Sequence, residues 1–129
     1  MLDYDGFILF VALNSAILLV LAINVSRLRI KHQIAWGDGG NKILMKAIRV
    51  HANGVEQVPV YALIILALTF VEAGRVLLSV LVMAFTLARI THAYGILCSV
   101  PVCRQIGAGV TYLAQAVATL VLLAGVFSL

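Results

Sequence analysis

The chain alternates between long apolar stretches and short polar segments. The first apolar stretch, from Gly6 to Val25, has 20 residues without a charged side chain. As a helix it is about 30 Å long, which matches the hydrocarbon thickness of a bilayer. Three more stretches of similar length follow it. The pattern therefore predicts four membrane-spanning helices, at about residues 6–26, 47–71, 76–98 and 105–127.

The composition agrees with this pattern. Of the 129 residues, 64% are hydrophobic and 11% are charged, and the mean hydropathy is +1.13. A soluble domain of this length cannot bury so much apolar surface. We therefore expect an all-α integral membrane protein, in which residues 1–129 form a single four-helix bundle.

The second span begins with polar residues, which are unusual in a segment otherwise suited to lipid. At about 100° per residue, Asn53 lies about 40° from Arg49 and Glu56 about −20°, so the three side chains share one face. His51 lies about 200° round the helix and faces the other way. Ionisable residues inside a span are costly and usually functional. The stripe predicts either a site for a zwitterionic, peptide-like ligand or a polar network between helices.

Two opposite charges lie deep in the predicted membrane segments. Counted at 1.5 Å per residue from the same surface, Glu56 is about 10 Å deep and Arg89 about 12 Å deep, on consecutive antiparallel helices. Neither charge should be left without a partner in hydrocarbon. We therefore expect Arg89 to approach Glu56, either directly or through a bridging group such as Asn53.

The basic residues gather at one end of the predicted bundle. By the positive-inside rule, the first and third loops should be cytoplasmic, and the polar stripe should open toward the cytosol. Arg75 is the single basic residue predicted at the opposite end. The basic residues of the first and third loops and their flanks are Arg27, Arg29, Lys31, Lys42, Lys46, Arg49 and Arg104.

Two classes of site have no support in the sequence. The three histidines are widely spaced, and Cys98 and Cys103 do not form a metal-binding motif, so we expect no metal site and two reduced thiols. The basic residues are not interleaved with aromatic ones, so we expect no nucleic acid partner.

The run R-x-H-x-N-x-x-E-x-x-P from Arg49 to Pro59, preceded by the turn Gly37-Asp38-Gly39-Gly40-Asn41, resembles the MAPEG family. These are the membrane-associated proteins of eicosanoid and glutathione metabolism. The similarity is closest to small bacterial members that resemble microsomal glutathione transferases. It implies a homotrimer in the bacterial inner membrane, with glutathione as co-substrate bound between subunits near the cytoplasmic side.

The resemblance also implies roles for single residues. Arg104 matches an arginine that stabilises the glutathione thiolate in catalytic members, although an anchor at the membrane interface would use the same residue. Two positions depart from the family pattern: Gln57 stands where many members have tyrosine, and Gly54 replaces a bulkier residue. The expected contacts to glutathione are Arg49, Asn53, Glu56 and Tyr94. Arg27, which follows the first span, could also reach back to an anionic ligand. His51, on the other face of the helix, would serve the site of the adjacent subunit or contacts at the trimer axis.

Taken together, the residues and the resemblance predict a glutathione transferase or peroxidase. Its second substrate would be a hydrophobic electrophile or a lipid peroxide dissolved in the membrane. The alternative is a non-catalytic, lipid-binding scaffold of the same family, which the glutamine at position 57 favours. A small multidrug exporter also has four spans, but such exporters use an acidic residue in the first span, and Gly6 to Val25 contains none.

Overall fold

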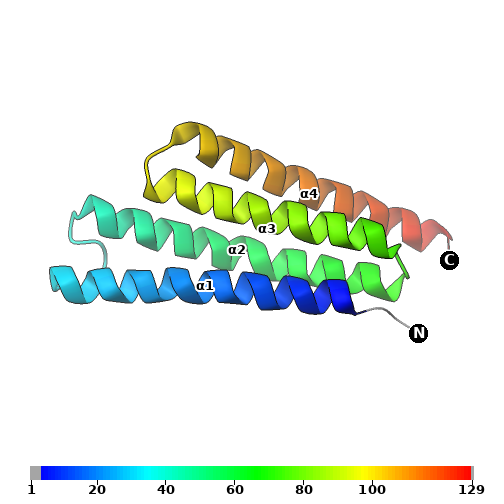
Figure 1. Cartoon of the computed structure of the whole chain (residues 1–129), viewed down its shortest axis with the longest axis horizontal. Coiled ribbons are helices and arrows are strands. Elements are labelled where there is room, and N and C mark those ends of the chain that lie inside the picture. The colour runs from blue at the N-terminus through cyan, green and yellow to red at the C-terminus, as the bar shows by residue number, and fades with distance from the viewer. Residues whose placement is uncertain (1–3, 129) are drawn as a thin grey trace.

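Four long helices, arranged side by side and antiparallel, make up the protein (Figure 1). The structure is a computed structural model that describes residues 4–128. The helices are α1 (Asp5–His32), α2 (Lys42–Phe70), α3 (Arg75–Leu97) and α4 (Pro101–Ser128). In the described part of the chain, α1 and α4 do not contact each other, and α2 and α3 lie between them.

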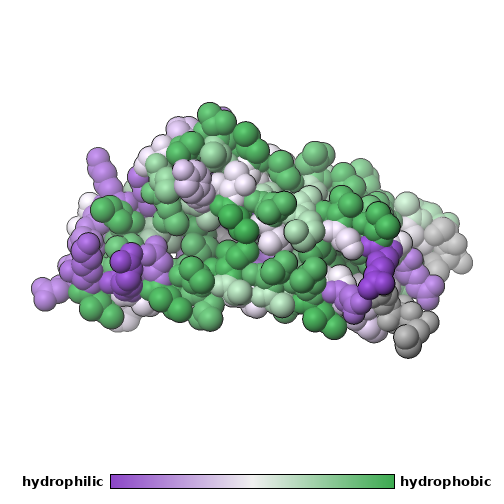
Figure 2. Space-filling view, in the orientation of Figure 1, coloured by the Kyte–Doolittle hydropathy of each residue, from purple (hydrophilic) through white to green (hydrophobic). Residues whose placement is uncertain are grey.

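All four helices are long and apolar enough to cross a membrane. Figure 2 shows apolar side chains over the middle of the molecule and hydrophilic ones at its two ends. This is the distribution expected of a bundle that spans a bilayer. The prediction of an all-α integral membrane four-helix bundle is confirmed.

Three of the four helices extend beyond the predicted spans at the end that carries the first and third loops. α1 continues to His32, α2 already begins at Lys42, and α4 begins at Pro101. Hydropathy marks where charges begin, but Arg and Lys are good helix formers, so the helices continue through them. Proline suits the first position of α4 because that position needs no N–H donor.

The apolar core occupies the half of the bundle farthest from the first and third loops. At its centre, the rings of Tyr61 and Phe85 stack with centroids 4.0 Å apart, and Phe10 packs against both rings. The Tyr61 hydroxyl donates to the carbonyl of Leu81 at 3.1 Å, which satisfies the one polar atom of this aromatic group. The other half of the bundle contains a smaller apolar cluster of Leu28, Leu44 and Ala47 and the buried Arg89 and His92 of α3.

Hydrogen bonds fix the first loop where it leaves α1, along its middle and where it enters α2. Gln33 adopts a left-handed conformation (φ 53°), and the N–H of Ile34 donates back to the Arg29 carbonyl, as in a Schellman motif. The Arg29 guanidinium donates to the carbonyls of Ile34, Ala35 and Gly37, at 3.3, 3.3 and 2.8 Å. Asn41 then caps α2 by accepting from two backbone N–H groups at 3.0 Å.

Two glycines bring α3 and α4 into backbone contact. A Cβ atom at Gly95 would lie 2.2 Å from the backbone nitrogen of Arg104, and one at Gly107 would lie 2.5 Å from that of His92. Small residues permit such close approach between membrane helices. The first turn of α4, which carries Arg104, is therefore positioned directly by the end of α3.

Candidate functional site

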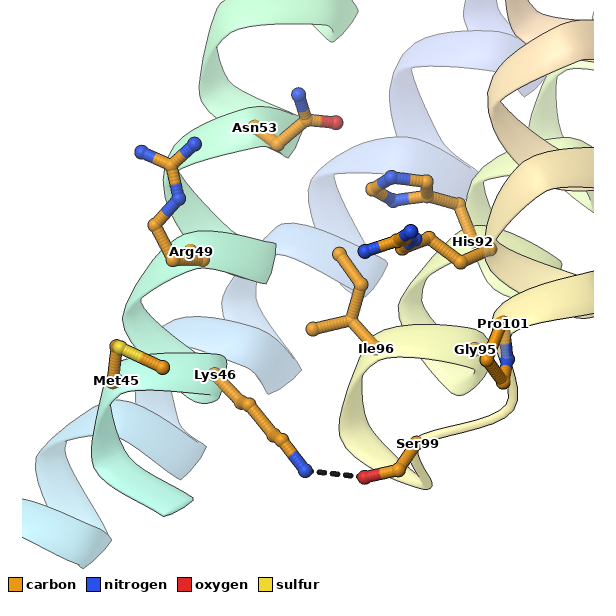
Figure 3. A pocket seen from close by; sticks show the side chains of 10 residues that line it. Met45, Lys46, Arg49, Asn53, His92, Gly95, Ile96, Ser99 and Pro101 are labelled. Carbon is orange, nitrogen blue, oxygen red and sulfur yellow. Dashed lines mark hydrogen bonds between the residues drawn. The ribbon is translucent and has the colours of Figure 1, made fainter. Parts of the chain in front are cut away.

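A pocket of about 540 Å³ lies between α2, α3 and the start of α4, at the end of the bundle that carries the first and third loops (Figure 3). α2 contributes one wall, and α3 faces it from the other side. The third loop and the first turn of α4 close the pocket beside α3. Its lining residues are Met45, Lys46, Arg49, Asn53, His92, Gly95, Ile96, Ser99, Pro101 and Arg104.

The pocket lining is basic and contains no acidic residue. Its three cations are Lys46 and Arg49 on α2 and Arg104 on α4. The Lys46 ammonium donates to the Ser99 hydroxyl, a contact that joins α2 to the third loop (Figure 3). No hydrogen bond within residues 4–128 occupies the guanidinium group of Arg49 or Arg104, and both side chains are exposed. The pocket therefore has an excess of positive charge and is suited to an anionic ligand.

The deep end of the pocket is polar and is supported from behind by a buried cation. Arg89 on α3 is only 5% exposed and does not line the pocket. Its guanidinium donates to Asn53 Oδ1 at 2.7 Å and lies 3.4 Å from His92 Nδ1. A guanidinium has no acceptor atom, so the oxygen of the Asn53 amide must point to it. The NH₂ group of Asn53 is then left to donate to a ligand.

Three of the predicted site residues meet in this pocket: Arg49, Asn53 and Arg104. The structure adds Lys46 and His92, which the sequence analysis had not placed at the site. The spacing of Lys46, Arg49 and Asn53 is i, i+3 and i+7, the pattern of one helix face, so this spacing could have identified Lys46.

The other predicted contacts do not line the pocket of a single chain. Glu56 is exposed, Tyr94 is 54% exposed and His51 is half-buried on α2. Arg27 is exposed and donates to Asn24 Oδ1 at 3.0 Å, within α1. These four residues are therefore separated from the basic pocket in the monomer.

The two departures from the family pattern also lie outside the pocket. Gly54 is buried on the side of α2 that faces α1, where a Cβ atom would lie 2.6 Å from Leu18 Cδ2. Gln57 lies in an open groove between α2 and α4 that Tyr112 and Gln115 also line. Gly54 thus serves the packing of α1 on α2.

In the described residues, Arg89 contacts Asn53 and does not approach Glu56 directly. Within residues 4–128, no ion pair joins these two side chains, and the charged group of Arg89 binds Asn53, the residue expected as a possible bridge. Asn53 and Glu56 lie on opposite sides of Arg49 around the helix, about 60° apart. Because Asn53 is the one turned toward α3, Glu56 remains on the outer surface of the bundle.

Comparison with known proteins gives a consistent result. The sequence model of the MAPEG family matches residues 7–124. The inner membrane protein YecN of Escherichia coli strain K12 is 31% identical over 87 residues, which cover 67% of this chain and 66% of YecN. YecN of Escherichia coli O6:H1 matches to the same extent. The chain thus spans about two thirds of the length of these curated relatives, and no solved structure matches it.

Proposed function

Because this chain belongs to the MAPEG family, we propose that it binds glutathione in the pocket between α2, α3 and the start of α4. The observation that carries the proposal is the convergence of Lys46, Arg49 and Arg104 on one cavity without an acidic residue. Glutathione has two carboxylates and a thiol that can ionise, so it offers three negative groups to three cations. The volume of about 540 Å³ is within the range of small-molecule sites.

The chemistry of each pocket group suggests a division of roles. Lys46 and Arg49 would bind the carboxylates, because charged hydrogen bonds to carboxylates are strong and Arg offers a planar fork. The NH₂ group of Asn53, oriented by Arg89, would donate to the peptide portion of the ligand. Arg104 would lie beside the sulfur, in the first turn of α4, where the helix dipole also favours a negative charge.

Ionisation of the sulfur would make the protein an enzyme. A free cysteine thiol has a pKa of about 8.5, and the thiolate is the reactive form. A guanidinium near the sulfur favours the thiolate, which could then attack a hydrophobic electrophile or reduce a lipid peroxide. The second substrate would reach the sulfur from the membrane, because the helices around the pocket are apolar where they face lipid.

A homotrimer would account for the predicted residues outside the pocket. The ammonium group of glutathione has no acidic partner among the residues that line the pocket of one chain. Glu56 and Tyr94 are exposed on the monomer, and in a trimer a neighbouring subunit would cover them. We propose that the complete site lies between subunits, with Glu56, Tyr94 and His51 contributing from the outer surfaces.

The distribution of charge suggests the orientation in the membrane. The pocket and most basic residues lie at the end with the first and third loops, which the positive-inside rule assigns to the cytoplasm. We propose the same orientation here, in a bacterial inner membrane. Glutathione is abundant in the cytosol, so the pocket would open to the compartment that supplies its ligand.

Arg49→Ala should weaken glutathione binding about ten- to a hundredfold. The reason is the loss of one charge-assisted hydrogen bond, worth about 1.5–3 kcal/mol. Isothermal titration calorimetry on the detergent-purified protein measures the affinity directly. The matched control is Lys42→Ala, which removes an exposed cation from the same helix but outside the pocket.

The comparison of these two variants tests the site itself. Elution of both variants at the wild-type position on size exclusion shows that the fold is retained. An Arg49→Ala protein that binds glutathione like the Lys42→Ala protein would rule out this pocket as the glutathione site.

Arg104→Ala should leave glutathione bound but return its sulfur to the thiol form. The expected signal is the loss of the ultraviolet absorbance of bound thiolate at neutral pH, measured as a difference spectrum on adding glutathione. If the wild-type protein binds glutathione without this absorbance, the non-catalytic scaffold becomes the better assignment. The glutamine at position 57, where many family members have tyrosine, is the feature that favours the scaffold.

A further inference from the structure

The α1–α2 hairpin extends past α3 and α4 at the end that carries the pocket (Figure 1). At 1.5 Å per residue, the 28 residues of α1 and the 29 of α2 give lengths of about 42 and 44 Å, whereas α3, with 23 residues, is about 35 Å long. The hydrocarbon core of a bilayer is only about 30 Å thick. A bilayer centred on the apolar middle of the bundle would leave the tip of the hairpin, which we define as residues 27–43, at the level of the lipid headgroups.

The hairpin tip exposes large apolar side chains at a level where the rest of the surface is polar. Trp36 is 90% exposed, Ile30 is 79% exposed and Ile43 is 61% exposed. Tryptophan is enriched at the boundary between headgroups and acyl chains, because its ring is apolar and its N–H is polar. These three side chains are suited to that boundary.

The exposure of Trp36 is imposed by a well-bonded loop. Arg29 donates to the carbonyls of Ala35 and Gly37, which flank Trp36 on both sides. The left-handed Gln33 and the Asn41 cap hold the two ends of the loop. The loop therefore keeps the indole ring outside the bundle, and the ring packs on no core cluster of the described residues.

Exposed cations lie among these apolar side chains. Arg27 and Lys31 are one turn apart on α1, and Lys42 begins α2. All three are exposed. The one acidic residue of the hairpin tip is Asp38, and its carboxylate accepts from the backbone N–H of Gly40 at 2.9 Å. The tip therefore combines uncompensated positive charge with an exposed aromatic ring.

We propose that the hairpin tip is a binding surface for anionic phospholipid headgroups. Arg27, Lys31 and Lys42 would bind the lipid phosphates, while Trp36, Ile30 and Ile43 insert at the acyl-chain boundary. Lys or Arg side chains next to a membrane helix each favour anionic lipid by about 1 kcal/mol, or about fivefold. Three such residues make the surface selective for anionic over zwitterionic lipid. This inference does not depend on glutathione binding.

The test uses the fluorescence of Trp36, the one tryptophan in the chain. The full-length protein is reconstituted in equal mixtures of phosphatidylglycerol and phosphatidylcholine, with one of the two lipids brominated near the headgroup end of its acyl chains. Bromine quenches only a nearby indole. We expect stronger quenching by brominated phosphatidylglycerol than by brominated phosphatidylcholine, and a smaller difference at high salt because exposed charges are screened.

A triple variant tests whether the three cations cause the preference for anionic lipid. In the triple variant Arg27→Gln, Lys31→Gln and Lys42→Gln, the preference should fall about tenfold or more. The control Arg75→Gln removes an exposed cation at the opposite end of the bundle and should keep the preference. Equal quenching by the two lipids in the wild-type protein overturns the proposal without any variant. A preference that persists in the triple variant, or quenching by neither lipid, also overturns it.

Discussion

Alanine at Gly95 or Gly107 is expected to separate α3 from α4 and to destabilise the protein by about 1–3 kcal/mol, the usual cost of overpacking. At Gly95 the added methyl group would lie 2.2 Å from the backbone nitrogen and 2.7 Å from the Cα of Arg104. At Gly107 it would lie 2.5 Å from the backbone nitrogen of His92 and 2.7 Å from the carbonyl of Ala88. Backbone atoms cannot rotate away, so the helices must shift.

The chain provides a matched control two residues further along α4. A Cβ atom at Gly109 would meet nothing within 4 Å, so Gly109→Ala should be neutral or stabilise α4 by up to about 1 kcal/mol. Thermal unfolding in detergent measures all three variants. Gly95→Ala should also weaken glutathione binding, because it displaces Arg104. If Gly95→Ala is as stable as Gly109→Ala, the backbone contact between α3 and α4 is not formed in the protein.

Arg89→Leu is expected to lower glutathione affinity about ten- to a hundredfold, although Arg89 does not line the pocket. The substitution removes the donor that binds Asn53 Oδ1 at 2.7 Å, so the amide loses its fixed orientation. It also removes a positive charge close to the proposed position of the glutathione anion, in surroundings of low dielectric constant. Burying the charge of Arg89 costs free energy, and this cost disappears in the leucine variant. The gain offsets part of the loss in folding stability. The loss of affinity should therefore exceed the loss of stability.

A double-mutant cycle with Asn53→Ala shows whether Arg89 acts through the amide. If it does, the double variant should bind glutathione about as weakly as the weaker of the two single variants. Calorimetry gives the affinities, and thermal unfolding shows whether the fold is retained. Additive losses would mean that Arg89 affects the ligand by another route, such as its charge alone.

The four helices and part of the site were predictable because each depends on local spacing. Hydropathy locates a span, and the angles between Arg49 and Asn53 place both on one helix face. The conclusion for Glu56 was incomplete for the same reason. A stripe about 60° wide has two sides, and only contacts between helices decide which side faces α3.

The remainder of the site depends on how the helices rotate and approach one another. His92 lines the pocket because Gly95 and Gly107 bring the start of α4 against α3. No pattern of polar residues specifies this packing, since it comes from the absence of side chains at two positions. Similarly, Lys46 was interpreted as a flanking charge, and its place in the pocket became evident only from its contact with Ser99 across the helix interface.

The absence of contact between α1 and α4 in the described part of the chain has a consequence for biogenesis. A ribosome delivers helices to the membrane in order, and each newly delivered helix here finds its partners among those already made: α2 packs on α1, and α3 packs equally on α1 and α2. α4, the last to emerge, packs chiefly on α3 and also on α2, and does not have to displace α1. Translation order and assembly order therefore coincide. The nascent chain can complete its tertiary structure as two successive hairpins, without rearranging helices already inserted.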